Sequence, residues 1–335
     1  MAKKKRTSAS GRKRGSKKEP KWLSSLKHVF YTACFVVVIA SAALYMYQVA
    51  SPYIEKWDWG QKESSVTRIN EALQKHPAIT EKEPKTKKEP VKDGSKPTGT
   101  FPAKFPQNAE LPRCLGRVSQ QIIRHEGYTV SYNSDYRVAN WVAYELTSAE
   151  SKSKQHERSN KFVRDPQVKG ASAENGDYTR TGYDRGHLAP AGDMKWSAKA
   201  MRESFYLSNI TPQKPGLNRG VWKELEEQCR MWAADNGALL IATGPILTPD
   251  LKRLGKNRVA IPRLFYKVIC MIQNDRYEAV GFLFENRDYG NTSLRSLMIP
   301  VDSVEKVTDI DFFPTLPDEV EKRIEASVNK NAWSF

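Results

Sequence analysis

A histidine in a segment dense with charged residues and glycines is the first sign of chemistry in this sequence. The segment reads TGYDRGHLAPAGD over residues 181–193 and places Asp184 and Arg185 shortly before His187. Glycine lets the backbone turn tightly there, so opposite charges come within reach of one imidazole. An unperturbed histidine side chain has a pKa of about 6.5, so His187 could act as a general base at physiological pH.

A second dense polar segment follows, SNITPQKPGLNRGVWKELE over residues 208–226. This pattern predicts a polar loop that runs into an amphipathic helix, expected over Asn218–Asp235. Asn218 lies at or near the start of that helix, where asparagine is a favoured N-cap. On this pattern alone, a capping role and a functional role for Asn218 are equally open.

Together, the two segments resemble the DNA/RNA non-specific endonucleases, the endonuclease G-like family of ββα-metal (His-Me finger) nucleases. The resemblance covers roughly residues 125–310, with both motifs in the family's order. The tetrapeptide DRGH alone would be a weak signal of the family, but together with the N-x-x-x-W-x-x-L-E segment it is a strong one. The resemblance implies an α+β fold, a ββα-metal domain with a layered mixed sheet and flanking helices.

The resemblance also implies roles for the residues that match the motifs. His187 would be the general base that takes a proton from the attacking water. Asn218 would be the direct ligand of a divalent metal, Mg²⁺ or Mn²⁺, whose remaining sites are water and phosphate. Glu226 would hold water on that metal, and Asp184 would orient the same waters or the neighbouring backbone.

Three arginines would contact the phosphates of the substrate. Arg185 looks like a clamp on the scissile phosphate, and Arg230, one turn beyond Glu226, like a second. The family often has another arginine upstream in an R…F…D-P stretch, for which this sequence offers Arg158 and Arg164. Glu226 and Arg230 are also i,i+4 neighbours, so an ion pair on the helix surface is the alternative for both.

Elementary chemistry is consistent with these roles. Mg²⁺ keeps several waters and needs only one or two protein oxygens, so one asparagine suffices. On a continuous helix, Asn218 and Glu226 are separated by about 12 Å of rise and about 80° of rotation. The carboxylate would therefore act through water. The expected reaction is hydrolysis of DNA and RNA phosphodiesters to 5′-phosphates, with little preference for sequence or sugar. The rival from another class is a non-catalytic nucleic-acid binding or uptake module on the same fold.

These residues need a scaffold, which we expect from residue 108 to residue 335. Alternating apolar residues predict a hairpin across Tyr128–Leu146, a buried strand over Leu239–Thr243 and a second hairpin from Leu264–Gln273 and Arg276–Phe284. Helices are expected over Ser197–Phe205, Asn218–Asp235 and Pro317–Ala326. Strands and helices do not alternate regularly, which favours an α+β domain.

The sequence before that domain predicts a membrane anchor. The net charge of the chain is +16, and residues 1–28 hold 11 Lys or Arg against one acid, so most of the basicity belongs to a tail. Residues 29–50 carry no Asp, Glu, Lys or Arg and are long enough to span a bilayer as one helix. Residues 51–107 are rich in Lys, Glu and Pro around positions 80–100 and predict a flexible linker.

The basic tail places the N-terminus in the cytoplasm and the nuclease domain outside it, in the periplasm if the cell is bacterial. Secretion after signal-peptide cleavage is the nearer alternative, since Ala40-Ser41-Ala42 resembles a cleavage site. A less favoured alternative is an intracellular nuclease in an organelle, with the basic tail as its targeting segment. Outside the cytoplasm, Cys114, Cys229 and Cys270 could form one disulfide at most, and we expect one, with Cys114 the freest to pair. Protein partners and oligomeric state stay open.

Overall fold

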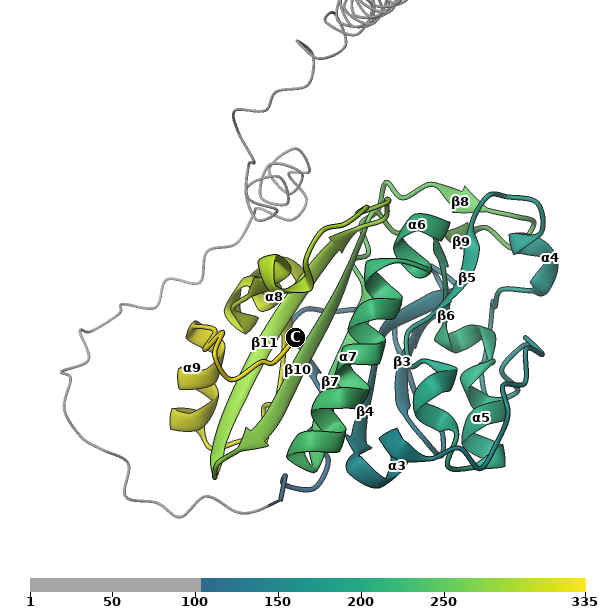
Figure 1. The fold of residues 1–335 in the computed structure, drawn as a ribbon. Helices are drawn as coiled ribbons and strands as arrows, with labels where there is room; N and C mark the ends of the chain where they lie inside the picture. Colours follow the sequence, from purple (N-terminus) through teal and green to yellow (C-terminus); the bar gives the residue numbers. More distant parts are fainter. Residues whose placement is uncertain (1–103) are drawn as a thin grey trace, which may run out of the picture. The chain divides into compact units, whose positions relative to one another are not determined.

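The computed structural model describes residues 104–335 (Figure 1). The predicted cytoplasmic tail 1–28, the membrane anchor 29–50 and nearly all of the linker 51–107 lie outside the described residues. Among the residues that are described, no helix is long and apolar enough to cross a membrane.

The centre of the domain is a seven-stranded sheet in the order β12-β11-β10-β7-β4-β3-β2. Every neighbouring pair in it is antiparallel. The predicted mixed sheet is therefore wrong, although the α+β class is confirmed. The order explains the antiparallel pairing, because β2–β3–β4 and β10–β11 are successive hairpins, and hairpins pair only antiparallel strands. The strands are β2 Gln121–Arg124, β3 Thr129–Asn133, β4 Val138–Thr147, β7 Ala238–Pro245, β10 Leu264–Gln273, β11 Arg276–Glu285 and β12 Met298–Ile299.

The two faces of this sheet bury different side chains because successive residues of a strand point in opposite directions. In β10, Phe265 and Ile269 belong to one core, and Tyr266 and Val268 to another. Helix α7 (Val221–Asn236) covers the first, which we call the front face. Helices α8 (Val301–Thr308) and α9 (Asp318–Ala326) cover the second, the back face (Figure 1).

The two motifs form one ββα unit on the front side. Strand β5 (Asp184–His187) pairs antiparallel with β6 (Ile210–Gln213), and the chain continues through α6 (Pro215–Asn218) into α7. The predicted helix Asn218–Asp235 is therefore two helices, separated at Arg219 and Gly220. Trp222, Leu225 and Trp232 of α7 are buried in the front core.

The other predicted elements are confirmed with small changes at their ends: the two hairpins, the strand at β7 and the helices at α5 and α9. The remaining elements are short: β1 Arg113–Cys114, β8 Arg253–Leu254, β9 Val259–Ala260, β13 Ile310–Asp311, α3 Ser148–Lys152, α4 Asn175–Tyr178, α5 Ala198–Ser204 and 3₁₀ turns at Ala191–Met194, Leu207–Asn209 and Leu294–Leu297. They surround the sheet and carry the loops of the ββα unit.

The cysteines form no disulfide among the described residues, so the expected bridge is wrong. Cys229 and Cys270 are buried, and Cys114 is half-buried. Cys229 lies in the front core and Cys270 in the back core, on opposite faces of the sheet. They pack as small apolar side chains.

Candidate active site

The β5–β6 hairpin holds the DRGH residues in a fixed register. Asp184 pairs with Gln213, and His187 pairs with Ile210. A Cβ atom on Gly186 would lie 2.1 Å from the side-chain oxygen of Gln213, so no larger residue fits between the two strands. Gln213 is fully buried, and both polar atoms of its amide lack a hydrogen-bond partner in the described part of the chain.

His187 lies in an aromatic pocket and is 7% exposed. Its ring is 4.9 Å from that of Phe205 and 5.4 Å from that of Phe162, measured between centroids. The indole of Trp222 donates a hydrogen bond to the backbone carbonyl of His187 over 3.3 Å. The His187 Nε2 atom is buried and has no hydrogen-bond partner among residues 104–335. The surrounding aromatic rings and the bond from Trp222 thus fix the imidazole in place.

Burial lowers the pKa of His187 to about 3, and the positive charge of Arg158 contributes to the same shift. The expected pKa of about 6.5 is therefore wrong for this structure, because an apolar pocket disfavours the charged imidazolium. The ring is neutral over the whole physiological pH range. A neutral imidazole is the form that can accept a proton.

Asn218 is the last residue of α6, and the N-cap of α7 is Gly220. The capping alternative for Asn218 is therefore wrong. Its amide instead donates a hydrogen bond to Asp184 Oδ2 over 3.0 Å, and Arg219 binds both oxygens of the same carboxylate at 2.7 Å. Burial raises the pKa of Asp184, but the hydrogen bonds from Arg219 and Asn218 outweigh it, so the net pKa is lowered. Asp184 is thus an anion that fixes the orientation of the Asn218 amide.

This orientation fits a divalent metal. With the nitrogen of Asn218 turned toward Asp184, its side-chain oxygen makes no hydrogen bond to any described residue and is available as a ligand. A hard cation such as Mg²⁺ accepts amide oxygen and fills its other positions with water. Asp184 comes from β5 and Asn218 from α6, so the hairpin and the short helix hold this site together.

Arg185 and Arg158 lie beside the aromatic pocket of His187. Arg185 donates a hydrogen bond to the carbonyl of Asn175 over 2.9 Å, and its guanidinium lies 5.4 Å from the Phe162 ring. Arg158 is exposed and lies 5.1 Å from the Phe205 ring. Its charge acts on His187 and on Glu226.

The structure decides between the two upstream arginines. Arg164 donates a hydrogen bond to the carbonyl of Gly170, whereas Arg158 lies over the Phe205 ring that packs on His187. Arg158 is therefore the arginine that the fold brings to the site.

Arg230 pairs with Asp193 and not with Glu226. The distance from its guanidinium to Asp193 Oδ1 is 2.8 Å, and the hydroxyl of Tyr144 donates to the other oxygen of Asp193 over 2.8 Å. The predicted alternative, an ion pair between Glu226 and Arg230 on the helix surface, is therefore wrong. Burial raises the pKa of Asp193, although Arg230 acts in the opposite direction.

Lys267 is a member of this group that the sequence analysis missed. Its side chain is on the front face of β10, is 1% exposed, and has no hydrogen-bond partner for Nζ within the described range. Nζ lies 4.7 Å from the centroid of the Trp222 ring. Burial raises the pKa of Glu226 to about 8, and Lys267 is the strongest influence that lowers it. A lysine at an inward-facing position of the apolar strand LFYKVICMIQ was the available signal.

Comparison with known proteins identifies the family of this chain. Residues 106–319 match the family model described as DNA/RNA non-specific endonuclease. This match covers well over half of the chain. The chain belongs to this family.

Individual family members are similar over the same region. Identity is 32% over 215 residues with human mitochondrial endonuclease G, covering 58% of this chain and 70% of that protein. Identity is 35% over 216 residues with nuclease C1 of Cunninghamella echinulata, and the match covers 59% of this chain and 84% of that protein. With mitochondrial nuclease EXOG of Danio rerio it is 33% over 207 residues, covering 57% of this chain and only 60% of that protein.

A solved structure shares the fold. It is a crystal structure of an EndoG/EndoGI complex that concerns the mechanism of EndoG inhibition. The TM-score is 0.57 at 31% identity, and the match covers 62% of this chain and 90% of that one. The similarity therefore extends over nearly the whole of the related domain.

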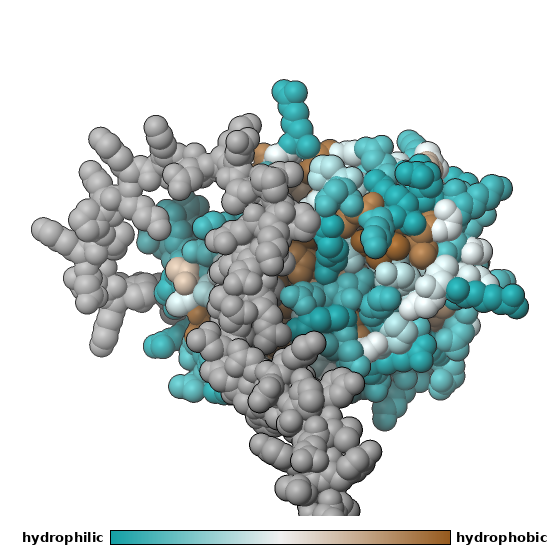
Figure 2. All heavy atoms as spheres, turned by 90° about the horizontal axis from the view of Figure 1, so that it is seen from above, coloured by the Kyte–Doolittle hydropathy of each residue, from teal (hydrophilic) through white to brown (hydrophobic). Residues whose placement is uncertain are grey.

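The surface of this family member is basic beside the site. A pocket of about 500 Å³ opens next to Arg230 and is also lined by Lys152, Lys154 and Lys195. The pocket lies at the α3 end of the domain, opposite the α6 end (Figure 1). Figure 2 views the α6 end, where hydrophilic residues cover most of the visible surface of the described domain. Four positive side chains around one pocket form a local surface suited to a polyanion.

Proposed function

We propose that the protein is a metal-dependent endonuclease that hydrolyses phosphodiester bonds in both DNA and RNA without sequence preference. The observation that carries this proposal is the neutral, rigidly held imidazole of His187 on the same ββα unit as the available oxygen of Asn218. Hydrolysis of a phosphodiester needs a base and a metal ligand held close together, whereas a protein that only bound nucleic acid needs neither.

His187 acts as the general base. It takes a proton from a water molecule, and that water attacks the phosphorus in line with the leaving 3′-oxygen, which leaves a 5′-phosphate. The low pKa of His187 keeps the ring unprotonated before the reaction. An approaching phosphate replaces water with negative charge, which favours the imidazolium that forms.

Asn218 holds the metal through its side-chain oxygen, with Mg²⁺ or Mn²⁺ as the ion. When bound, the ion supplies positive charge that stabilises the negative charge developing on the phosphate and on the leaving oxygen. Asp184 is a positioning residue, because it fixes the Asn218 amide. Glu226 orients water in the site through its carboxylate.

The arginines bind the phosphates of the substrate. Arg158 and Arg185 lie beside His187, where the scissile phosphate must come. Arg230 is held by Asp193 at the edge of the basic pocket, where the next phosphates pass. Contacts of this kind read charge and carry no base information, which is consistent with an enzyme that cleaves any sequence.

The proposal includes the location of the enzyme. Residues 29–50 anchor it as a single-pass membrane protein, residues 1–28 lie in the cytoplasm, and the linker 51–107 carries the nuclease domain on the opposite side. The support is the apolar run and the basic tail before it. Protease added to intact spheroplasts should remove residues 108–335 and leave an N-terminal fragment protected. Protection of the whole domain would contradict this topology, and a mature chain that starts after Ala42 would favour secretion.

The decisive test of activity uses the full chain with plasmid DNA and with RNA, in Mg²⁺ or in EDTA. We expect cleavage of both substrates in Mg²⁺ and none in EDTA. Asn218→Ala should lower Mg²⁺-dependent cleavage by at least ~10²-fold, the scale of losing one charge-stabilising interaction in a water-excluded site.

Asn236→Ala is the matched control, because Asn236 lies at the other end of α7, where its amide donates to the carbonyl of Trp232 and accepts from Gln273. It should cleave at the wild-type rate. If the protein binds both nucleic acids but cleaves neither in Mg²⁺ or Mn²⁺, it is a binding module and the enzyme proposal is wrong.

A further inference from the structure

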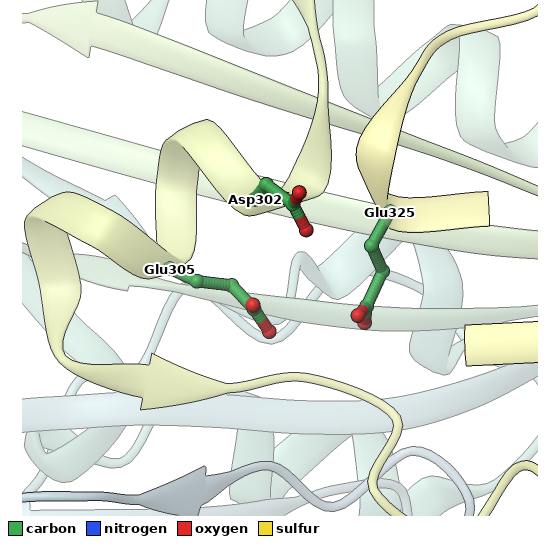
Figure 3. A group of neighbouring side chains, drawn as sticks. All are labelled: Asp302, Glu305 and Glu325. Atoms are coloured by element: carbon green, nitrogen blue, oxygen red, sulfur yellow. The ribbon is translucent and has the colours of Figure 1, made fainter. Parts of the chain in front are cut away.

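Three carboxylates converge on the back face, away from the ββα unit. Asp302 and Glu305 belong to α8, and Glu325 belongs to the last turn of α9. Each offers one oxygen, and these three oxygens all lie within 4.8 Å of one another. Figure 3 shows the side chains pointing from the two helices into the same space.

Glu325 is the unusual member of the group. It is 5% exposed, and its Oε1 atom is buried without a hydrogen-bond partner in the part of the chain that the structure describes. An ionised carboxylate is rarely left buried and unpaired, because removing it from water is costly. The Glu325 carboxylate is directed toward the other two (Figure 3), so the group lacks a positive partner at its centre.

Within residues 104–335, no Lys or Arg forms an ion pair with any of the three carboxylates. Asp311 and Glu321 add negative charge, and both raise the pKa of Glu325 together with Glu305 and Asp302. Arg113 is committed to an ion pair with Asp311. The three carboxylates therefore need either protons or a cation.

We propose that Asp302, Glu305 and Glu325 bind a divalent cation of the calcium type, which joins α8 to α9 on the back face. Ca²⁺ binds oxygen ligands at about 2.3–2.6 Å, so two of its ligands can be as far as roughly 5 Å apart. The spacing of the three oxygens satisfies this limit without any movement. The backbone N–H of Phe312 already holds the Glu305 carboxylate over 2.8 Å, so part of the site is fixed in advance. Water completes the coordination on the exposed side, at Asp302.

The experiment uses the full chain carrying Asn218→Ala, so that the catalytic centre contributes no cation binding. The protein is stripped with EDTA, and its melting temperature is measured with and without Ca²⁺. A cation at about 100 times its Kd should raise the melting temperature by roughly 5 °C or more. Adding Glu325→Gln should abolish the increase, since the amide has the same shape but no charge.

Glu319→Gln is the matched control, because Glu319 is an exposed carboxylate on the same helix α9. It should keep the full Ca²⁺ effect. Crystals soaked in Mn²⁺ should show an anomalous peak between the three carboxylates. An equal Ca²⁺ effect with and without Glu325→Gln, no effect in either protein, or no anomalous peak would overturn the proposal. Nuclease activity enters none of these measurements, so failure of this site and failure of the proposed function are distinguishable.

Discussion

The two faces of the central sheet bury carboxylates in opposite ways. On the front face, Asp193 pairs with Arg230, and the buried ammonium of Lys267 acts on both Asp193 and Glu226. On the back face, the strongest influences on Glu325 are burial and other carboxylates. The same sheet therefore separates a charge-compensated group from an uncompensated one.

The difference indicates two uses for buried charge. On the front face, the protein supplies its own positive partners, and positive side chains continue outward around the basic pocket. A substrate with many phosphates can then bind without additional repulsion. On the back face, the protein supplies only negative groups, so a cation or protons from solution must complete the site. The charges on the front face thus favour binding of an anion, and those on the back face favour binding of a cation.

The largest expected difference between the faces is in cleavage. His187→Ala should lower the rate by at least ~10²-fold, the usual scale for loss of a positioned general base. Glu325→Gln, on the back face, should leave the rate unchanged. Single-turnover cleavage of plasmid DNA at saturating Mg²⁺ measures both variants. If His187→Ala keeps the wild-type rate with an unchanged melting curve, His187 is not the base.

A smaller effect is expected from the charges around the pocket. Lys154→Ala combined with Lys195→Ala removes two positive side chains beside Arg230. Binding of duplex DNA should weaken, and the slope of log K against log salt should decrease by about 2, since each phosphate contact contributes about 0.9.

The control for that prediction removes two positive charges from the back face, by Lys322→Ala and Arg323→Ala in α9. The salt slope of this control should equal that of the wild type. Equal slopes for all three proteins would mean that nucleic acid does not pass over the pocket. Binding is measured by fluorescence anisotropy. All three proteins carry Asn218→Ala, so that the DNA is not cleaved during the measurement.

Lys267→Met would make the front face resemble the back face. Without the ammonium, the carboxyl pKa values of Glu226 and Asp193 rise further, because Lys267 lowers both. We expect a loss of up to about 1.4 kcal/mol in the free energy of unfolding at pH 9, because the ionised Glu226 carboxylate no longer has the positive charge that lowers its pKa. The loss should shrink toward pH 6, where the Glu226 carboxyl, with a pKa of about 8, is protonated in both proteins. Lys252→Met, at an exposed position, is the control in urea titrations. A loss independent of pH would show that Lys267 acts only through packing.

The sequence predicted most of the scaffold and the residues of the two motifs. Regular apolar alternation located the hairpins of β3–β4 and β10–β11, because local pattern determines which residues face a core. It could not reveal Lys267 or Asp193 as neighbours of Glu226, since three separate segments meet there only in the folded chain. The pKa of His187 was also inaccessible, because it depends on Phe162 and Phe205 closing around the ring.

The break between α6 and α7 was missed for a different reason. The segment PGLNRGVWKELE has the apolar spacing of one helix, and only the two glycines signal a turn. The back-face cluster was missed because Glu325 lies far along the chain from Asp302, and acidic residues on a helix usually face solvent.

The smallest expected effect concerns the response of the back face to pH. Glu325 has a pKa of about 10 in the folded protein against an ordinary value of 4.5. Between these two values, the folded chain holds a proton that the unfolded chain has lost. The contribution of Glu325 to stability is therefore greatest below pH 4.5 and falls as the pH rises toward 10, because the unfolded state binds fewer protons.

In cation-free buffer, we expect the wild type to lose a few tenths of a kcal/mol per pH unit more than Glu325→Gln does. This is well below the limit of about 1.4 kcal/mol per unit for one proton, because water reaches Asp302 and screens the cluster. The variant should also be the more stable protein at pH 8. Saturating Ca²⁺ should reverse that order, since the wild type gains a ligand that the variant cannot bind. Thermal unfolding at pH 6 and pH 8, with EDTA or with Ca²⁺, measures all four combinations. If the wild type and the variant show the same pH dependence in EDTA, the back-face carboxylates are already compensated and the contrast between the two faces fails.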